Sequence, residues 1–290
     1  MRVGVMQMNP GYDKAANIAQ AQGLLTNTHA IDGFLSLPEM WSCLGGDRAR
    51  KLDQAENLPG FGTGATGGAA YEFLRDTARN LRCVVHGGSI GELGQGAEAG
   101  RLFNTTVVFD ADGREIARYR KIHLFDITTP DGTGYRESAM YGAGQEIVTY
   151  QAAGVTVGAS ICYDMRFGEM FLSLRRRGAE LIFVPSSFTV PTGQAHWHVL
   201  LRARAIETQC WIAAPATVGQ HLDASGGTRT TYGHSLICDP WGQVVAEQEE
   251  GLGIVDAEID RSLTARIRRD MPVLEHRGMS EAVPLAGRAA

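Results

Sequence analysis

Short apolar runs recur along the chain, and their length of roughly four to eight residues favours strands over helices. They are rich in Val, Ile, Leu and Phe, and they lie at 2–8, 33–38, 81–90, 155–162, 180–187, 211–216, 232–240, 242–247 and 253–260. Two further runs, 103–110 and 114–121, flank Asp112 and Gly113, which is a pattern typical of a β-hairpin. The apolar pattern therefore predicts a protein with many short strands.

Four segments carry helical patterns instead. They lie at 14–30, 168–178, 195–210 and 260–270, and Gly178 is placed to end the second of them as a C-cap. Strands and helices alternate over the first two thirds of the chain, whereas strands cluster afterwards. This order predicts a single α/β domain, residues 1–276, with substantial sheets covered by helices. The tail at 277–290 has little pattern of its own, and it could reach a partner subunit.

Composition and charge exclude several classes of protein. The chain has 27 Lys and Arg against 32 Asp and Glu, a net charge of −5, and no basic stripe, which argues against nucleic-acid binding. A hydrophobic content of 44% with 20% charged residues excludes a disordered chain. No apolar run approaches the roughly 18 residues of a membrane span, and the N-terminus lacks an apolar signal core. We therefore expect a soluble cytoplasmic protein without a membrane partner.

Five cysteines are candidates for chemistry: Cys43, Cys83, Cys162, Cys210 and Cys238. Their number is odd and no pair has CxxC spacing, which argues against a disulfide framework and a cysteine zinc site. Cys162 is the strongest nucleophile candidate, because it ends an apolar strand just before a polar stretch. The alternative, a buried inert cysteine, is retained for the other four.

Charged residues follow two other predicted strands. Glu39 comes after LSLP, where a carboxylate is costly to bury unless it is paired or functional, although a surface glutamate is the simpler alternative. Lys121 follows the hairpin in RYRKIHLFD, and a solvated edge lysine is its alternative. Glu137 lies in the loop GYRESAMY, where carboxylates are usually solvated.

The histidines give no clear catalytic pattern. His123, His196 and His198 fit packed core or loop residues, although a Cys–His hydrolase stays open at this point. There is no HExxH motif, P-loop or dinucleotide fingerprint. The sequence accordingly predicts neither a metal nor an organic cofactor.

Taken together, the segments LPEMW, YRKIHLFD and ICYDMRF closely resemble the nitrilase superfamily of carbon–nitrogen hydrolases. Each contributes one member of that family's Glu–Lys–Cys triad, in the family's chain order. RESAMYGAG resembles the loop that carries the family's second glutamate. HWHVLLRARAIETQC and YGHSLICDPWGQVVAE resemble the Nit amidase branch, and LLRARAIETQC is most like its deaminated-glutathione amidases.

The resemblance implies a fold and a mechanism. The fold would be a four-layer α-β-β-α sandwich, usually dimerised through one helical layer, and the protein would be a homodimer or a higher homo-oligomer. Cys162 would be the nucleophile and Glu39 the general base, while Lys121 and the backbone N–H of Tyr163 would hold the oxyanion. Glu137 would orient Lys121 or the substrate amide. The reaction would hydrolyse an amide of a small carboxylated metabolite through a thioester, without a cofactor.

Substrate recognition stays open within this resemblance. Arg166 would bind a substrate carboxylate, or else form an internal salt bridge to Asp164 or Glu169. Phe188 lies near the expected pocket, where other residues are common in the branch. Gly168 replaces the usual Pro, and Met170 is also a departure. The alternatives are a nitrilase or N-carbamoyl amino-acid hydrolase of the same superfamily, and a non-catalytic interaction protein that retains the fold.

Overall fold

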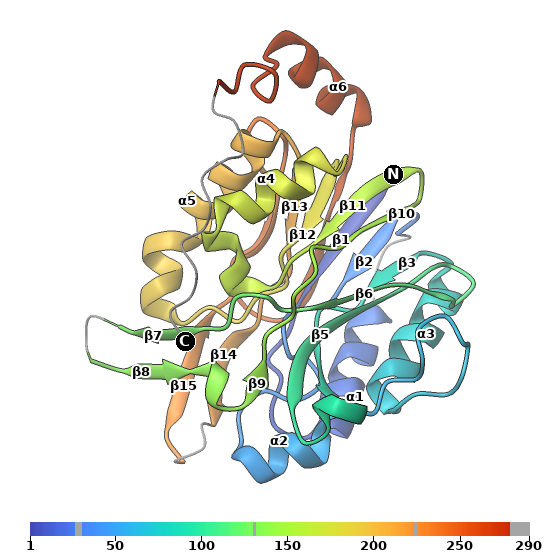
Figure 1. The fold of residues 1–290 in the computed structure, drawn as a ribbon, viewed down its shortest axis with the longest axis vertical. Coiled ribbons are helices and arrows are strands. Elements are labelled where there is room, and N and C mark those ends of the chain that lie inside the picture. The colour runs from blue at the N-terminus through green and yellow to red at the C-terminus, as the bar shows by residue number, and fades with distance from the viewer. Residues whose placement is uncertain (27–30, 130–131, 223–225, 279–290) are drawn as a thin grey trace.

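The computed structural model describes residues 1–26, 31–129, 132–222 and 226–278 (Figure 1). The helices are α1 (Lys14–Leu25), α2 (Arg48–Gln54), α3 (Ala69–Leu81), α4 (Gly168–Arg176), α5 (Val190–Thr208) and α6 (Arg261–Asp270). The strands of the first half are β1 (Arg2–Gln7), β2 (Phe34–Ser36), β3 (Val84–His86), β4 (Ile90–Leu93), β5 (Leu102–Phe109), β6 (Glu115–Arg120), β7 (Asp126–Thr128), β8 (Gly134–Arg136) and β9 (Tyr141–Gly142). Those of the second half are β10 (Thr149–Ala152), β11 (Val155–Ala159), β12 (Leu181–Phe183), β13 (Trp211–Ala214), β14 (Val218–Leu222), β15 (Thr228–Tyr232), β16 (Ser235–Cys238), β17 (Val244–Gln248) and β18 (Gly253–Glu258).

Two large mixed sheets form the centre of the molecule. The first has the order β18-β1-β2-β3-β5-β4, with β6 and β9 also paired to β5, and the second has the order β10-β11-β12-β13-β16-β17. In each sheet three neighbouring strands are parallel, β1-β2-β3 and β11-β12-β13. Parallel strands need crossover connections, and helices make them here, as the alternating pattern predicts.

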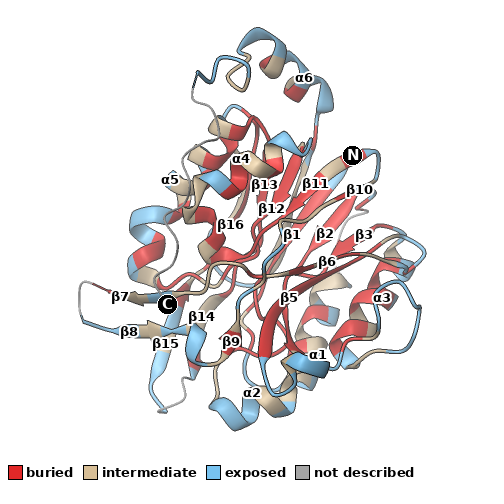
Figure 2. Cartoon of the chain, viewed as in Figure 1, coloured by how far each residue is buried: buried red, intermediate tan, exposed pale blue. Residues whose placement is uncertain are grey.

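The alternation of side chains along the strands explains the layers. On β12 and just after it, Leu181 and Phe183 enter the core between the two sheets, whereas Ile182 and Val184 pack against α4 and α5. The first sheet likewise packs its outer face on α1 and α3. The central strands of both sheets are buried on both faces, with the helices outside them (Figures 1 and 2). The four-layer α-β-β-α sandwich is thereby confirmed.

Some of the helices, strands and turns predicted from the sequence are confirmed, and other predictions of this kind were incomplete. The hairpin forms as β5 and β6, and Gly178 lies just beyond α4 with a φ of +93°. The predicted helix at 14–30 is described as far as Leu25, because residues 27–30 lie outside the described part. The run at 81–90 is not one strand, since α3 ends at Leu81 and two short strands follow. The sequence analysis missed α2 and α3.

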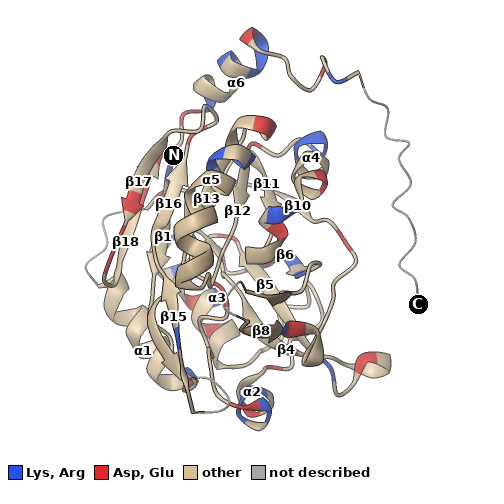
Figure 3. Cartoon of the chain, turned by 90° about the vertical axis from the view of Figure 1, so that its left-hand side faces the viewer, with Lys and Arg blue, Asp and Glu red and all other residues tan. Residues whose placement is uncertain are grey.

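The surface carries charges of both signs. In the view of Figure 3, Lys and Arg positions are scattered among acidic ones, without a basic stripe. None of the helices in the described ranges is both long and apolar enough to cross a membrane. The domain boundary at 276 stays a prediction, and residues 279–290 of the tail lie outside the described part.

Candidate active site

A cavity of about 1080 Å³ opens where the segments after β2, β6 and β11 meet. Its wall includes the four side chains singled out in the sequence, Glu39, Lys121, Glu137 and Cys162, together with Tyr163. Further wall comes from α2, the loops around β8 and β9, and the β14–β15 hairpin. The structure therefore brings together residues that are 123 positions apart in the chain.

Glu39 is held by a turn that follows β2. The next residue, Met40, has a φ of +51°, and its backbone N–H donates to Ser89 Oγ at 2.9 Å. A side chain at Gly88 would meet Pro38 O at 2.2 Å, so only glycine allows this close approach. The loop after β3 thus fixes the turn, and the Glu39 side chain is only 5% exposed.

Lys121 lies between two carboxylates. Its Nζ donates to Glu39 Oε1 at 2.8 Å and to Glu137 Oε2 at 2.9 Å. Glu137 is fixed in turn by the backbone N–H of Phe125, which donates to Oε2 at 2.6 Å. A lysine that is 2% exposed with two partners is no solvated edge lysine, so that alternative is wrong.

The carboxylates set the protonation state of the lysine. Burial alone would lower the pKa of Lys121, but Glu137 and Glu39 outweigh it and raise the pKa well above its ordinary value. Two carboxylates around one ammonium leave one negative charge in excess. The cluster therefore has a fixed cation and can accept a proton on a carboxylate.

Cys162 begins a 3₁₀ turn in a rare backbone conformation. Its φ is +48°, and its N–H donates to Pro185 O at 2.9 Å. Buried Asp164 closes the turn, because Oδ2 accepts from the Ile161 N–H at 2.8 Å and from the Tyr119 hydroxyl at 2.7 Å. A strained turn after a strand presents a nucleophile at a sheet edge, and the N–H groups of its first residues have no acceptor within the helix.

The thiol of Cys162 is protonated at neutral pH. Burial raises its pKa well above the ordinary value, and the negative charge of Glu39 raises it further. Lys121 and the backbone of Ser187 act in the opposite direction, but they do not compensate. Glu39 is close enough to the thiol to act on its pKa and lines the same cavity, so an acceptor for the proton is in place.

The comparison with known proteins agrees with this geometry. Residues 2–269 match the carbon-nitrogen hydrolase family. The protein named deaminated glutathione amidase from Synechocystis is 40% identical over 275 residues, which are 94% of this chain and 96% of that protein. This chain belongs to the carbon-nitrogen hydrolase family.

Other relatives of this hydrolase lead to the same fold. The human protein named deaminated glutathione amidase is 38% identical, over 95% of this chain and 81% of its own. The crystal structure of Saccharomyces cerevisiae Nit3, a member of branch 10 of the nitrilase superfamily, has a TM-score of 0.83 at 27% identity, covering 96% of this chain and 97% of Nit3. The Caenorhabditis elegans NitFhit structure has a TM-score of 0.81 at 34% identity, covering 96% of this chain and 65% of the NitFhit chain.

The hydrolase has a further polar residue in this cluster that the sequence analysis missed. Asn104 Nδ2 donates to Glu39 Oε1 at 2.9 Å and to Glu137 Oε1 at 3.2 Å, so it ties the two carboxylates together. Its Oδ1 is buried without a partner among the described residues. An asparagine inside the apolar run LFNTTVVF was the available signal, because a buried amide is costly.

Arg166 is not brought to the cavity of the hydrolase. Its Nη2 lies 3.3 Å from His196 Nδ1, and its guanidinium stands over the rings of Tyr163 and Phe188. No salt bridge to Asp164 or Glu169 forms, because the oxygens of Asp164 accept other hydrogen bonds and Arg166 pairs with no described carboxylate. The predicted alternative of an internal salt bridge is therefore wrong.

Phe188, Gly168 and Met170 depart from the sequence pattern of the Nit amidase branch, and they lie in different parts of the structure. Phe188 lines the cavity and packs on Trp197 at 5.0 Å between ring centroids. Gly168 faces α5 instead, where an added Cβ would lie 3.4 Å from Arg204 Nη1, and Met170 is buried behind the turn near Tyr119. Of the three, only Phe188 can touch a bound substrate in this structure.

His123, His198 and His234 lie outside the cavity, whereas His221 is part of its wall. His123 Nδ1 contacts Asp164 Oδ1 at 2.8 Å and its ring stacks on Phe167. His198 Nε2 and His234 Nδ1 both contact Glu247 Oε1, at 2.8 and 2.7 Å. These three residues form the group, among the described ones, whose ligand atoms lie close enough to hold a metal ion. None of them lines the cavity.

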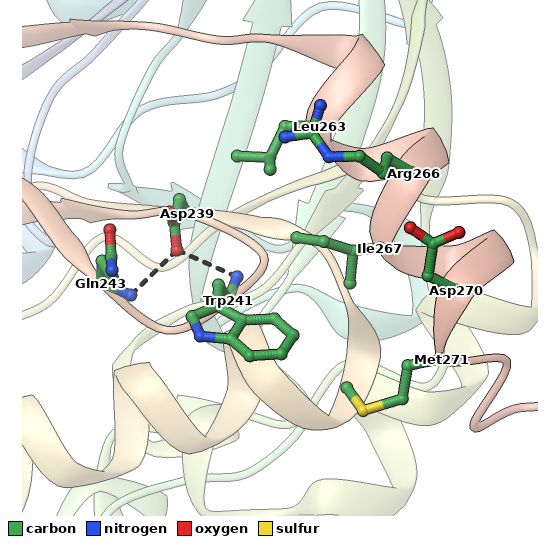
Figure 4. A pocket seen from close by; sticks show the side chains of 8 residues that line it. All are labelled: Asp239, Trp241, Gln243, Leu263, Arg266, Ile267, Asp270 and Met271. Atoms are coloured by element: carbon green, nitrogen blue, oxygen red, sulfur yellow. Dashed lines mark hydrogen bonds between the residues drawn. The ribbon is translucent and has the colours of Figure 1, made fainter.

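A second hollow lies beneath α6, and none of the residues that line it also lines the cavity at Cys162 (Figure 4). It measures about 550 Å³, and it is lined by Asp239, Trp241, Gln243, Leu263, Arg266, Ile267, Asp270 and Met271. Asp239 Oδ1 accepts from the N–H groups of Trp241 and Gln243, both at 2.9 Å, so it holds a turn. This hollow has no nucleophile, and it is not a candidate for the hydrolytic chemistry.

Proposed function

We propose that this hydrolase is an amidase that cleaves an amide of a small carboxylated metabolite through a thioester on Cys162. Deaminated glutathione is the leading substrate, and an ω-amide such as 2-oxoglutaramate is the second. The observation that carries the proposal is the buried Glu39–Lys121–Glu137 cluster beside a thiol at the wall of a cavity. The curated relatives named deaminated glutathione amidase support the leading substrate.

In the first step, Cys162 attacks the amide carbonyl carbon. Its thiol is neutral at rest, so a proton must leave as the sulfur–carbon bond forms. Glu39 takes that proton. Lys121 and Asn104 both donate to Glu39 Oε1, which leaves Oε2 as the acceptor. The carbonyl electron pair moves onto the oxygen, which becomes an oxyanion.

The oxyanion is stabilised by the Lys121 ammonium and by the backbone N–H of Tyr163. Each such donor in a water-poor site is worth about 10²–10³ in rate. Glu137 keeps Lys121 charged and oriented through its bonds to Nζ. Glu137 is thereby a positioning residue for the lysine.

Collapse of the intermediate breaks the carbon–nitrogen bond, and Glu39 returns its proton to the leaving amine or ammonia. Water then attacks the thioester while Glu39 takes one of its protons. The second tetrahedral intermediate releases the acid, and the departing sulfur recovers the proton from Glu39. The cycle needs no metal or organic cofactor.

The test is a panel of carbon–nitrogen substrates assayed in parallel with the purified protein. Deaminated glutathione, 2-oxoglutaramate, a nitrile and an N-carbamoyl amino acid would be compared by release of amine or ammonia. The proposal predicts the highest kcat/KM for one of the two carboxylated amides. Preference for the nitrile or the carbamoyl compound would replace it with the corresponding hydrolase, and no turnover of any would favour a non-catalytic interaction protein.

We further propose that the hydrolase forms a homodimer through α5. Val199 is 67% exposed and Ile206 is 44% exposed, and their spacing of seven places them on one helix face. Trp241, 56% exposed, follows Asp239 in the turn whose Gly242 touches Ile206. Light scattering should give a dimer mass, and Val199→Glu with Ile206→Glu should give a monomer that keeps its secondary structure.

A cytoplasmic location is part of the same proposal. All five cysteines are free thiols, as is usual where glutathione and thioredoxin keep thiols reduced. Fractionation of the source cells with antibody detection would test it, and enrichment in the membrane or secreted fraction would contradict it.

A further inference from the structure

We propose that Arg229 and Lys51 form an anion site that binds a carboxylate on the acyl chain of the substrate. This inference rests on the proposed amidase function and names the substrate class of the same cavity: amides whose acyl chain ends in a carboxylate. Neither residue belongs to the Glu–Lys–Cys set, and the sequence pattern had indicated Arg166 for this task.

The charges of the cavity wall are unevenly distributed. Among its described residues the carboxylates are Glu39 and Glu137, and both are bonded to Lys121. Four further cations line the same cavity, namely Arg48, Lys51, Arg136 and Arg229. The cavity wall outside the Lys121 cluster is therefore positive, which suits an anionic substrate.

Arg229 is fixed beside the reacting cysteine. It lies on β15, and its Nη2 donates to Ser187 Oγ at 3.0 Å. The same oxygen accepts from Thr217 Oγ1 at 3.0 Å, so Ser187 is itself held in place. Ser187 and Cys162 line the same cavity, and the backbone of Ser187 is close enough to lower the pKa of the Cys162 thiol. One residue thus joins the guanidinium to the nucleophile, while the other guanidinium N–H groups make no bond within the described part.

Lys51 is the second cation of the proposed anion site, and it also lines the cavity. It lies on α2, and its ammonium forms no ion pair with any described carboxylate. Burial lowers its pKa, and the positive charge of Arg229 lowers it further, so the two cations are close enough to repel each other. The Glu137 charge acts in the opposite direction, but Glu137 is already bonded to Lys121, so a bound anion would still relieve the repulsion between the two cations.

The chain is built to hold these two elements together. Gly46 N–H donates to Leu222 O at 3.1 Å, which ties the loop before α2 to the β14–β15 hairpin. A Cβ at Gly45 would lie 2.2 Å from Leu222 O, and the φ of Gly45 is +88°. Only glycine permits this approach, so the pairing of Lys51 with Arg229 follows from local sequence.

The position relative to Cys162 selects the acyl side of the substrate. Arg229, Ser187 and Cys162 line one cavity, and Arg229 is bonded to Ser187, so a carboxylate on the Arg229 fork shares the cavity with an acyl group held at the sulfur. The fork matches a carboxylate bidentately, and the lysine adds a point charge. The site therefore suits a short acyl chain that ends in a carboxylate, as in glutaramate, and deaminated glutathione has such a chain.

The test compares two amides, glutaramate and butyramide, which have the same acyl chain except that glutaramate carries a terminal carboxylate. Arg229→Gln should lower kcat/KM for glutaramate by about 10- to 100-fold, the range for a lost hydrogen bond to a charged group. Butyramide hydrolysis should change by less than about threefold. Arg229→Lys should recover part of the loss, and Lys51→Gln should show the same selectivity with a smaller effect. Arg79→Gln on α3 removes an exposed charge outside the cavity, and it should alter neither substrate.

Equal losses for both amides in Arg229→Gln would overturn the proposal, because they would indicate that Arg229 only positions Ser187. No loss for either would overturn it as well. A second measurement does not depend on turnover: calorimetric binding of glutarate to Cys162→Ala, with and without Arg229→Gln. Weaker binding by about tenfold or more supports the site, and equal binding contradicts it. If the wild type cleaves no amide yet glutarate binding depends on Arg229, the proposed function fails and the anion site stands.

Discussion

Cys162 and Cys210 belong to the same half of the molecule and are both buried, but their surroundings differ. Burial raises the pKa of each thiol. The Cys210 thiol donates to Ala179 O at 3.0 Å and is completely buried. The Cys162 thiol lies at a cavity wall, next to a carboxylate that can take its proton and an ammonium that can hold an oxyanion.

The comparison indicates that a raised thiol pKa does not by itself make a cysteine unreactive. A cysteine with an unoccupied acceptor beside it can lose its proton during attack, so it needs no standing thiolate. Cys210 has a carbonyl for a partner, which can accept a hydrogen bond but cannot take the proton. Position and partners, rather than the thiol itself, separate the proposed nucleophile Cys162 from Cys210.

The largest expected effect comes from exchanging each cysteine for alanine. Cys162→Ala should lose more than about 10³-fold in kcat while melting near the wild-type temperature. Cys210→Ala should keep kcat within a few-fold and lower the melting temperature, because it leaves a cavity. Steady-state kinetics and thermal melts on both variants test this prediction. Turnover by a folded Cys162→Ala variant would contradict the role of Cys162 as the nucleophile.

Glu39→Gln sharpens the comparison between Cys162 and Cys210, because it removes the proton acceptor beside Cys162 but keeps the shape of the side chain. We expect kcat to fall by about 10³-fold, within the range for general-base catalysis. At the same time the pKa of Cys162 should fall, because the Glu39 charge raises it in the wild type. The pH profile of iodoacetamide alkylation should therefore move to lower pH. Retained turnover would show that another group accepts the proton.

Lys121→Met should lower kcat by about 10²-fold through the lost oxyanion donor. It should also cost about 3–5 kcal/mol of stability, because two carboxylates remain buried without their cation. Adding Glu137→Gln should restore part of the melting temperature but none of the turnover. If the double variant regained activity, Lys121 would have only a structural role.

The smallest effect concerns a buried titratable group that the chemistry does not use. Burial between the sheets lowers the pKa of His86 from 6.5 to about 3. The folded state therefore holds a neutral imidazole, and stability that is present above pH 6.5 is lost as the pH falls toward 3. At pH 4 the loss is about 3 kcal/mol. His86→Leu should flatten the melting temperature between pH 6.5 and 4, and an unchanged acid slope would contradict this.

Much of the site could be predicted from the sequence, because Glu39, Lys121 and Cys162 each follow a strand in a distinctive segment. The sequence could not reveal Asn104, Arg229 or Lys51, whose importance depends on contacts between distant segments. It also missed α3, where Ala70, Leu74 and Ala78 follow helical spacing but alanine is too small for a strong apolar signal. The positive φ of Met40 and Cys162 was equally hidden, since neither residue type prefers it.

The most direct test of the account is to look for the thioester itself. The protein would be mixed with its best amide substrate, quenched in acid during steady turnover, digested and analysed by mass spectrometry. The account predicts an acyl adduct on the peptide that contains Cys162 and on no other cysteine, released by hydroxylamine. An adduct on a different residue, or steady turnover with Cys162 never modified, would contradict covalent catalysis at this site.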